Sequence, residues 1–198
     1  MTGMNRSSDR HPIFREQCVI ASPIGKLGIT TQLVDGSLMI SEISYLPKGV
    51  RAIFPQNDLA REAKVQLEAY FDNPFFRFNL PLKPQGTAFQ NRVWTAIGEI
   101  EAGKTASYGA LAKRIKSGSR AVGGACGANF YPLVIPCHRV LSANGLGGFM
   151  QQGGVIGRHL DIKRWLLHHE GVIITLWEPH PEGGRKVPLR NYCGRQFW

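Results

Sequence analysis

The first 83 residues alternate between apolar and polar positions and then change to a helical period. Residues 18–21 and 27–31 flank a turn that contains Pro23 and Gly25, and Asp35-Gly36 separates the second stretch from residues 38–45. Such turns join antiparallel strands, so the pattern predicts three strands connected as hairpins. From Asp58 to Phe71, apolar residues recur at helical spacing. Residues 1–83 are therefore expected to form a small α+β domain.

Helical patterns dominate after an extended linker at residues 81–86. Thr87 is expected to cap a helix that ends near residue 100, Ser107 a second short helix, and Ser119 a third helix over residues 120–128. The last two are joined by a turn that ends at Gly118, which is typical of a helix-turn-helix. Gly123 and Gly124 disfavour a helix, so this composition indicates either tight helix packing or close approach by another surface.

The rest of the chain contains one further helix. Residues 133–135 are expected to form a short buried strand, and a glycine-rich loop follows from residue 145 to residue 157. Asp161 is expected to cap a helix that Gly171 closes. Residues 84–171 thus form a mainly helical second domain, and residues 172–198 are an extension to which the pattern assigns no element.

Charge is concentrated in the second domain. The net charge is +10, and residues 84–171 hold 10 Lys and Arg against 4 Asp and Glu, whereas residues 1–83 hold 10 against 8. A basic segment of this kind suits a polyanion such as nucleic acid.

The composition predicts a cytoplasmic protein. Hydrophobic residues make up 43% and charged residues 19% of the chain, no apolar run reaches the roughly 18 residues of a membrane span, and residues 1–10 lack a signal-peptide core. The 4 cysteines are not spaced for a metal or redox site, so we expect no metal, no cofactor and no disulfide.

The densest chemical signal is Pro136-Cys137-His138-Arg139. A cysteine is nucleophilic as the thiolate, which a neighbouring base or cation favours. Because adjacent side chains of an extended chain point apart, His138 is expected to reach the sulfur through a water molecule or in a turn. Glu170 is a candidate to orient the imidazole. On these residues alone, a structural Cys-His pair and a Cys-His hydrolase stay open, although no oxyanion hole is evident for the latter.

These residues make the chain similar to the O6-alkylguanine-DNA alkyltransferases, also called methylated-DNA–protein-cysteine methyltransferases. The resemblance extends over residues 84–171, is looser over residues 14–83 and is absent from the extension. The motifs that carry it, in order, are residues 84–94, Ser107-Tyr108, residues 120–125, Asn129, residues 135–140, residues 163–167 and Glu170-Gly171.

The resemblance implies a role for each matching residue. Cys137 is expected to accept the alkyl group irreversibly, in a single turnover, with His138 as a water-mediated base and Glu170 as its orienting carboxylate. Asn129 is expected to hold the turn around the cysteine. Tyr108 is expected to crowd the DNA phosphate, to assist rotation of the target nucleotide and to protonate the guanine leaving group.

The resemblance also implies a partner, double-stranded DNA bound through the minor groove without sequence preference. Arg120 is expected to fill the gap left by the flipped base. The remaining expected DNA contacts are Ala121, Gly124, Ala125, Tyr108 and Arg139. The expected lining of the substrate pocket is Pro132, Val140, Phe149 and Met150.

The implied fold is a ribonuclease-H-like N-terminal domain followed by a helical DNA-binding and catalytic domain. The protein is expected to be a monomer, and cooperative assembly on DNA, activity on O4-alkylthymine and the preferred adduct size are left open. Two departures from the family pattern are Phe130, where proline is frequent, and a lengthened loop at residues 147–158. Cys18 and His11 alone do not support an N-terminal metal site.

Two further functions compete with repair. A non-repairing relative that only recognises alkylated bases lacks an acceptor cysteine, whereas Cys137 is present here. A helix-turn-helix regulator would need side chains that read bases in the major groove, and the glycine-rich helix lacks them.

Overall fold

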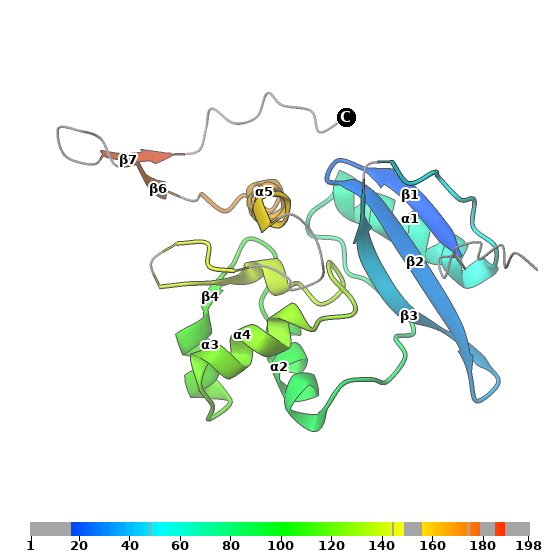
Figure 1. Ribbon diagram of the computed structural model, residues 1–198, viewed down its shortest axis with the longest axis horizontal. Helices are drawn as coiled ribbons and strands as arrows, with labels where there is room; N and C mark the ends of the chain where they lie inside the picture. Colours follow the sequence, from blue (N-terminus) through cyan, green and yellow to red (C-terminus); the bar gives the residue numbers. More distant parts are fainter. Residues whose placement is uncertain are drawn as a thin grey trace, which may run out of the picture.

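The computed structural model describes residues 17–47, 49–143, 145–148, 156–173, 175–178 and 185–188. Strands β1 (Cys18–Ser22), β2 (Gly25–Val34) and β3 (Ser37–Leu46) form an antiparallel sheet in the order β1-β2-β3 (Figure 1). Asp35 and Gly36 connect β2 to β3 with φ values of 48° and 79°, the backbone that a tight hairpin requires. The predicted hairpins are confirmed.

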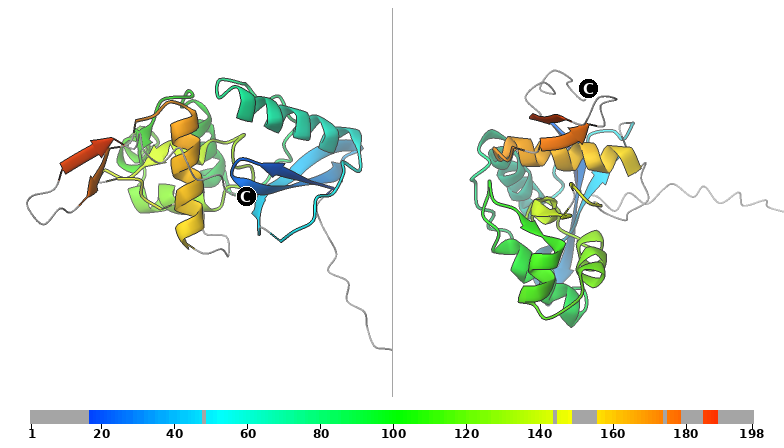
Figure 2. Two further views of the ribbon diagram at one scale, coloured as in Figure 1. Left: turned by 90° about the horizontal axis from the view of Figure 1, so that it is seen from above. Right: turned by 90° about the vertical axis from the view of Figure 1, so that its left-hand side faces the viewer.

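Helix α1 (Asp58–Asp72) packs against this sheet (Figure 2). It begins at the N-cap Asn57, whose side chain accepts the Ala60 N–H at 2.8 Å, and it ends where Asn73 leaves helical geometry. Its buried residues include Ala63, Leu67 and Tyr70, which join the sheet in one hydrophobic core. The expected α+β arrangement of strands and one helix is therefore present.

The linker at residues 81–86 is fixed along the edge of the sheet. The Ile40 N–H donates to the Pro81 carbonyl at 2.8 Å, and the Lys83 N–H donates to the Ile40 carbonyl at 2.8 Å. The chain enters the helical region from this edge, so the position of the next helix is tied to β3.

The helical region begins with α2 (Ala88–Gly98), α3 (Tyr108–Arg114) and α4 (Ser119–Gly127). Thr87 caps α2 through a reciprocal pair of hydrogen bonds with Gln90, and Ser107 caps α3 by accepting the Ala110 N–H at 3.0 Å, both as expected. The prediction that Ser119 caps the third helix is wrong. Gly118 occupies the N-cap, and Ser119 is already the first helical residue.

Helix α5 (Ile156–His169) lies above α2, α3 and α4 in the view of Figure 1, and its Ile162 and Leu166 join the core of the sheet and α1 (Figures 1 and 2). The prediction that Asp161 caps this helix is wrong, because the helix begins five residues earlier and Asp161 pairs with Arg164 inside it. The predicted end is confirmed, since Gly171 has a φ of 77° and the Val172 N–H returns to the Leu167 carbonyl at 2.8 Å.

The segment at residues 133–135 is not a strand. It belongs to a run of turns in which Leu133 has a φ of 75°, and the Ile135 N–H donates to the Tyr131 carbonyl at 2.8 Å. Leu133 is buried and Val134 and Ile135 are half-buried, but the Ile135 carbonyl accepts from the Asn129 side chain and not from a neighbouring strand.

Two short strand pairs complete the fold. β4 (Ala106–Ser107) and β5 (Val140–Leu141) are parallel, and β6 (Thr175–Glu178) and β7 (Arg185–Pro188) are antiparallel, the latter within the extension to which the pattern assigned no element. Among the residues described, no helix combines the length and the apolar character that crossing a membrane requires.

The buried residues form two cores. One unites the sheet and α1 with Tyr131, Leu133, Ile162 and Leu166, and the other joins α2, α3 and α4 around Cys126, Cys137 and Val140. The first core therefore contains residues from both sides of position 83. The boundaries of the two domains stay a prediction.

Candidate active site

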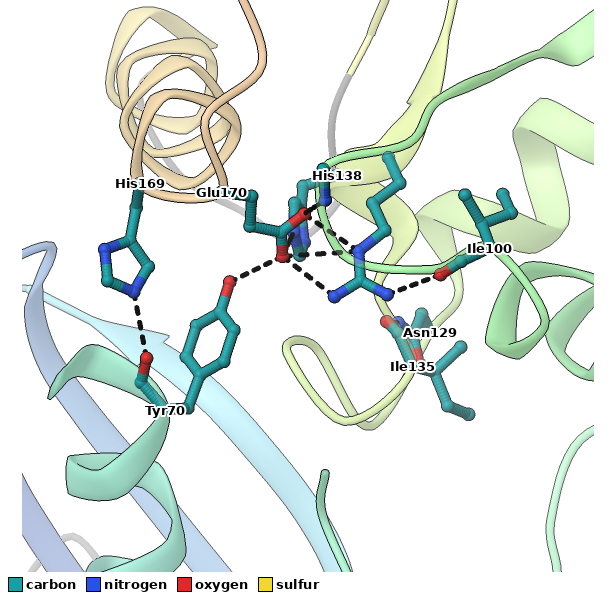
Figure 3. Close-up of polar contacts among 9 residues, drawn as sticks. Tyr70, Ile100, Asn129, Ile135, His138, His169 and Glu170 are labelled. Atoms are coloured by element: carbon teal, nitrogen blue, oxygen red, sulfur yellow. Dashed lines mark hydrogen bonds and ion pairs between the residues drawn. The ribbon is translucent and has the colours of Figure 1, made fainter. Parts of the chain in front are cut away.

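Cys137 begins a 3₁₀ turn, η1 (Cys137–Arg139), after a loop that Asn129 holds together. The Asn129 side chain is buried, its Nδ2 donates to the Ile135 carbonyl at 2.8 Å, and its Oδ1 accepts the Tyr131 N–H at 2.9 Å (Figure 3). These bonds close the chain between α4 and the cysteine into a compact loop. Asn129 thus bonds backbone groups on both sides of this loop, and its role in the reaction stays a prediction of the resemblance.

The two residues that follow η1 bring the start of α3 close to Cys137. Val140 and Leu141 pair in parallel with Ala106 and Ser107, and Tyr108 follows directly. Tyr108 packs against the core that contains Cys126 and Cys137. Burial raises the pKa of the Tyr108 phenol, and these two thiols raise it further. Two segments far apart in the sequence therefore meet beside the cysteine.

The imidazole of His138 is buried and faces Glu170. Its Nε2 lies 2.8 Å from Glu170 Oε1 (Figure 3). Burial raises the pKa of Glu170, but hydrogen bonds from His138 and Arg139 outweigh it and hold the pKa at about 2. An ionised carboxylate can only accept, so the proton of the neutral ring is on Nε2, and Nδ1 is the basic nitrogen.

The His138 ring is neutral at neutral pH. Burial lowers its pKa below the ordinary value of 6.5, and the hydrogen bond to Glu170 only partly opposes this. A neutral imidazole whose Nε2–H is held by a carboxylate can take up a proton at Nδ1, which is the arrangement of an oriented general base.

Glu170 also binds two side chains from other elements. Arg139 Nη2 donates to Oε1 at 2.8 Å, Arg139 Nε donates to Oε2 at 2.9 Å, and Nη1 donates to the Ile100 carbonyl. The Tyr70 hydroxyl of α1 donates to Oε1 at 2.8 Å (Figure 3). The carboxylate is thus surrounded by donors from the turn η1 and from helix α1.

The prediction of a DNA contact for Arg139 is corrected by this arrangement. Only 11% of its side chain is exposed, and its guanidinium points inward to Glu170 and Ile100. A buried carboxylate needs a partner cation, and Arg139 meets this need with a two-pronged geometry that lysine could not supply.

Cys137 is 2% exposed, and this burial determines how readily its thiol loses a proton. Burial raises its pKa above the ordinary value of 9.0, whereas a hydrogen bond from the Asn129 side chain and the charge of Lys163 act in the opposite direction. At neutral pH the sulfur is therefore protonated at rest. A base must remove its proton before it can act as a nucleophile.

Lys163 is a buried cation of the same site. Its Nζ donates to the Val140 carbonyl at 2.7 Å and to the Gly148 carbonyl at 3.0 Å, and it lies 5.7 Å from the centre of the Tyr108 ring. Burial lowers the pKa of Lys163 to about 8, against the opposing effect of Cys137 and Cys126. The Tyr108 hydroxyl donates to the same Gly148 carbonyl at 3.0 Å, so both side chains hold the loop at residues 145–148.

Helix α4 presents an open face of small residues with one arginine. Arg120, Ala121 and Gly124 are exposed, and nothing lies within 4 Å of a Cβ placed at Gly124. The predicted surface position of Ala125 is wrong, because Ala125 is 3% exposed and its carbonyl accepts the Trp94 indole N–H at 2.9 Å. The open face is therefore narrower than predicted.

Two of the four predicted pocket residues lie among those that the structure describes. Pro132 and Val140 are buried near the cysteine turn. Phe149 and Met150 lie outside the residues that the structure describes, as does most of the lengthened loop. A pocket lining by these four residues stays a prediction.

Sequence reasoning assigned no role to Tyr70 or Lys163. Lys163 could have been found, because Lys163, Leu166, Leu167 and Glu170 follow the spacing of one buried helix face on which a lysine is unusual. For Tyr70 no local signal exists, since it lies 100 residues from Glu170 in the chain.

Comparison with known proteins agrees with this geometry. A family model described as "6-O-methylguanine DNA methyltransferase, DNA binding domain" matches residues 88–172. A methylated-DNA–protein-cysteine methyltransferase of Methanosarcina mazei is 46% identical over 116 residues, which cover 57% of this chain and 69% of the relative. A protein of the same name from Haemophilus influenzae is 42% identical over 161 residues, which cover 76% of this chain and 83% of the relative.

A similar solved structure is that of Mycobacterium tuberculosis OGT in complex with DNA. It aligns with a TM-score of 0.61 and 35% sequence identity, over 77% of this chain and 91% of the other. The likeness therefore extends beyond the helical region into the sheet and α1.

Proposed function

The chain belongs to the methylated-DNA–protein-cysteine methyltransferase family, and we propose that Cys137 is the cysteine to which it transfers the methyl group. Its activity is the repair of DNA by methyl transfer from O6-methylguanine to the protein itself. The single observation that favours Cys137 concerns the next residue, His138. Its buried imidazole lies 2.8 Å from the Glu170 carboxylate, which can hold it as a base beside the thiol.

The first step of the proposed reaction is activation of the thiol. The proton of Cys137 passes through a water molecule to Nδ1 of His138, and Glu170 stabilises the imidazolium that forms. The charge of Lys163 favours the resulting thiolate. Because the buried thiol is otherwise protonated, removing the base or its carboxylate should slow the reaction at neutral pH.

The second step is a direct displacement at the methyl carbon. The sulfur lone pair forms the new S–C bond while the C–O6 bond breaks, and the electron pair of that bond goes to the guanine. Tyr108 supplies the proton that neutralises the guanine and is reprotonated from solvent. In the free protein the Tyr108 hydroxyl donates to the Gly148 carbonyl, so it must leave that partner before it can act on the base.

The product is a thioether, which thiolates do not cleave under cellular conditions. Each molecule therefore reacts once, without a cofactor. Because a base stacked in a duplex cannot reach a buried thiol, the target nucleotide must rotate out of the helix, at a cost of a few kcal/mol.

We propose that α4 binds the minor groove of duplex DNA and that Arg120 occupies the space of the rotated base. Exposed Arg120, Ala121 and Gly124 support this, because small residues let the helix approach closely while the guanidinium offsets unstacking. Contacts to phosphates carry no base information, so binding is expected to be sequence-tolerant and to weaken as salt increases.

Intact-mass measurement after mixing with a duplex that contains O6-methylguanine tests the proposal. The expected result is a gain of one methylene mass, located by peptide mapping to Cys137, and no gain in Cys137→Ser. Cys126→Ser is the matched control, because it removes a buried thiol of the same core and should still gain the mass. Tight binding without any gain would favour the non-repairing alternative, and cleavage of an ester or amide substrate would favour a hydrolase.

A further inference from the structure

We propose that Tyr70 of α1 is a positioning residue for the His138–Glu170 pair, so that the N-terminal unit completes the active site. This inference rests on the proposed roles of Cys137 and His138. It follows from one contact. Tyr70 packs in the core of the sheet, and its hydroxyl donates a hydrogen bond to Glu170, the carboxylate that faces His138.

The geometry around Glu170 Oε1 is crowded. This single oxygen lies 2.8 Å from the Tyr70 hydroxyl, 2.8 Å from His138 Nε2 and 2.8 Å from Arg139 Nη2 (Figure 3). The side chain of Glu170 is 0% exposed, and Tyr70 is 1% exposed. Without water to compete, the three donors fix both the position of the carboxylate and the direction in which it accepts.

Tyr70 is itself firmly held. Its carbonyl accepts from Nε2 of His169, the residue before Glu170, at 2.9 Å (Figure 3). Its ring packs against Phe78 at 5.6 Å and against His169 at 5.4 Å between centroids. The phenol therefore meets Glu170 from a fixed frame, and α1 and the end of α5 are joined by backbone and side chain at once.

The hydroxyl also limits how strongly Glu170 attracts a proton. Burial, and next the charge of Glu170, raise the pKa of Tyr70 far above 10.0, so the phenol is a donor at every working pH. A hydrogen bond to an anionic oxygen disperses its charge, and Glu170 then stabilises the imidazolium of His138 less strongly. Loss of the hydroxyl should raise the pKa of His138 and loosen the carboxylate at the same time.

The test compares Tyr70→Phe with Tyr131→Phe and with the unchanged protein. Tyr70→Phe retains the packed ring and removes only the donor to Glu170. Tyr131→Phe is matched, because it also removes a buried phenol, one that donates to the Lys83 carbonyl and accepts from Gln85 without touching Glu170. Single-turnover methyl transfer from O6-methylguanine duplex is measured from about pH 5 to about pH 9, together with DNA affinity.

For Tyr70→Phe we expect a rate about 5-fold to 50-fold lower near neutral pH, part of the roughly 10²–10⁴-fold that a positioned base contributes. The acidic limb of its rate–pH profile should move to higher pH, and its DNA affinity should be unchanged. Tyr131→Phe should have the same acidic limb as the wild type. The proposal is overturned if Tyr70→Phe reacts like the wild type, or if both variants lose the same factor at every pH. If the wild type itself gains no methyl group, the proposed function fails instead, and the two failures are distinguishable.

Discussion

Arg139 and Glu170 meet as two parallel forks, with Nε 2.9 Å from Oε2 and Nη2 2.8 Å from Oε1. The Glu170 side chain is 0% exposed and that of Arg139 is 11% exposed, so water screens the pair very little. The carboxylate that orients His138 therefore also neutralises a buried cation. Stability and chemistry depend on the same group.

Glu170→Gln should consequently destabilise the fold. The change leaves the Arg139 guanidinium buried without its counter-charge, which typically costs about 3–5 kcal/mol. Glu99→Gln is the control, since Glu99 pairs with Arg114 at the surface, where an ion pair contributes at most about 1 kcal/mol. Urea unfolding of both variants measures the difference, and equal losses would contradict the prediction.

The same carboxylate should make the fold sensitive to acid. The pKa of Glu170 is about 2 in the folded protein against an ordinary value of 4.5, so the folded state binds the proton less readily than the unfolded chain. Its stabilisation is present above about pH 4.5 and is lost as the pH falls toward 2, with an upper limit of about 3 kcal/mol. Free energies of unfolding measured at several pH values should fall more steeply for the wild type than for Glu170→Gln. Parallel profiles would count against this assignment.

Lys163→Met should make Cys137 harder to ionise. The ammonium lowers the pKa of the thiol, so its removal should shift the pH dependence of Cys137 alkylation by iodoacetamide to higher pH. Peptide mapping by mass spectrometry separates Cys137 from the other thiols. Arg164→Met is the control, because Arg164 is the neighbouring cation on α5 and pairs with Asp161 at the surface. An unshifted Cys137 profile in Lys163→Met would refute the role of the charge.

Arg120→Ala should separate base rotation from chemistry. Arg120 is exposed on α4 and has no place in the Cys137–His138–Glu170 arrangement. Methyl transfer from duplex DNA should therefore slow by at least about 10-fold, since a few kcal/mol of unstacking is no longer offset. Transfer from the free O6-alkylguanine base should be unchanged. Arg61→Ala, an exposed arginine of α1, should affect neither reaction, and an equal loss on both substrates would contradict the role of Arg120.

Gly124→Leu should strengthen the helix while weakening DNA binding. A Cβ at Gly124 has nothing within 4 Å and the residue is exposed, so an added side chain can extend into solvent, and helix propensity favours leucine by up to about 1 kcal/mol. The same side chain should obstruct close approach of the minor groove. Gly98→Leu on α2 also has open space and is the control. Thermal unfolding and DNA titration of both variants measure the two effects, and unchanged affinity in Gly124→Leu would remove α4 from the interface.

Several elements are determined by their local sequence. Asp35-Gly36 can adopt the positive φ values of a hairpin turn, and Thr87 and Ser107 cap helices that begin at the next residue. Each depends on hydrogen bonds between residues a few positions apart, so the pattern predicts them. Where the pattern was wrong, a residue able to cap a helix lies inside one: Ser119 is the first residue of α4, and Asp161 is five residues into α5.

The proposed nucleophile, its proposed base and the carboxylate beside that base could also be named from the sequence, because the motifs that contain them resemble one family. Only the tertiary structure, by contrast, determined which side chains of each element face the core. It turned Arg139 and Ala125 inward, and it brought Tyr70 to a carboxylate 100 residues away in the chain. Such contacts arise from how α1, α4 and α5 pack, and packing depends on shape and burial summed over the whole chain rather than on any local run of residues.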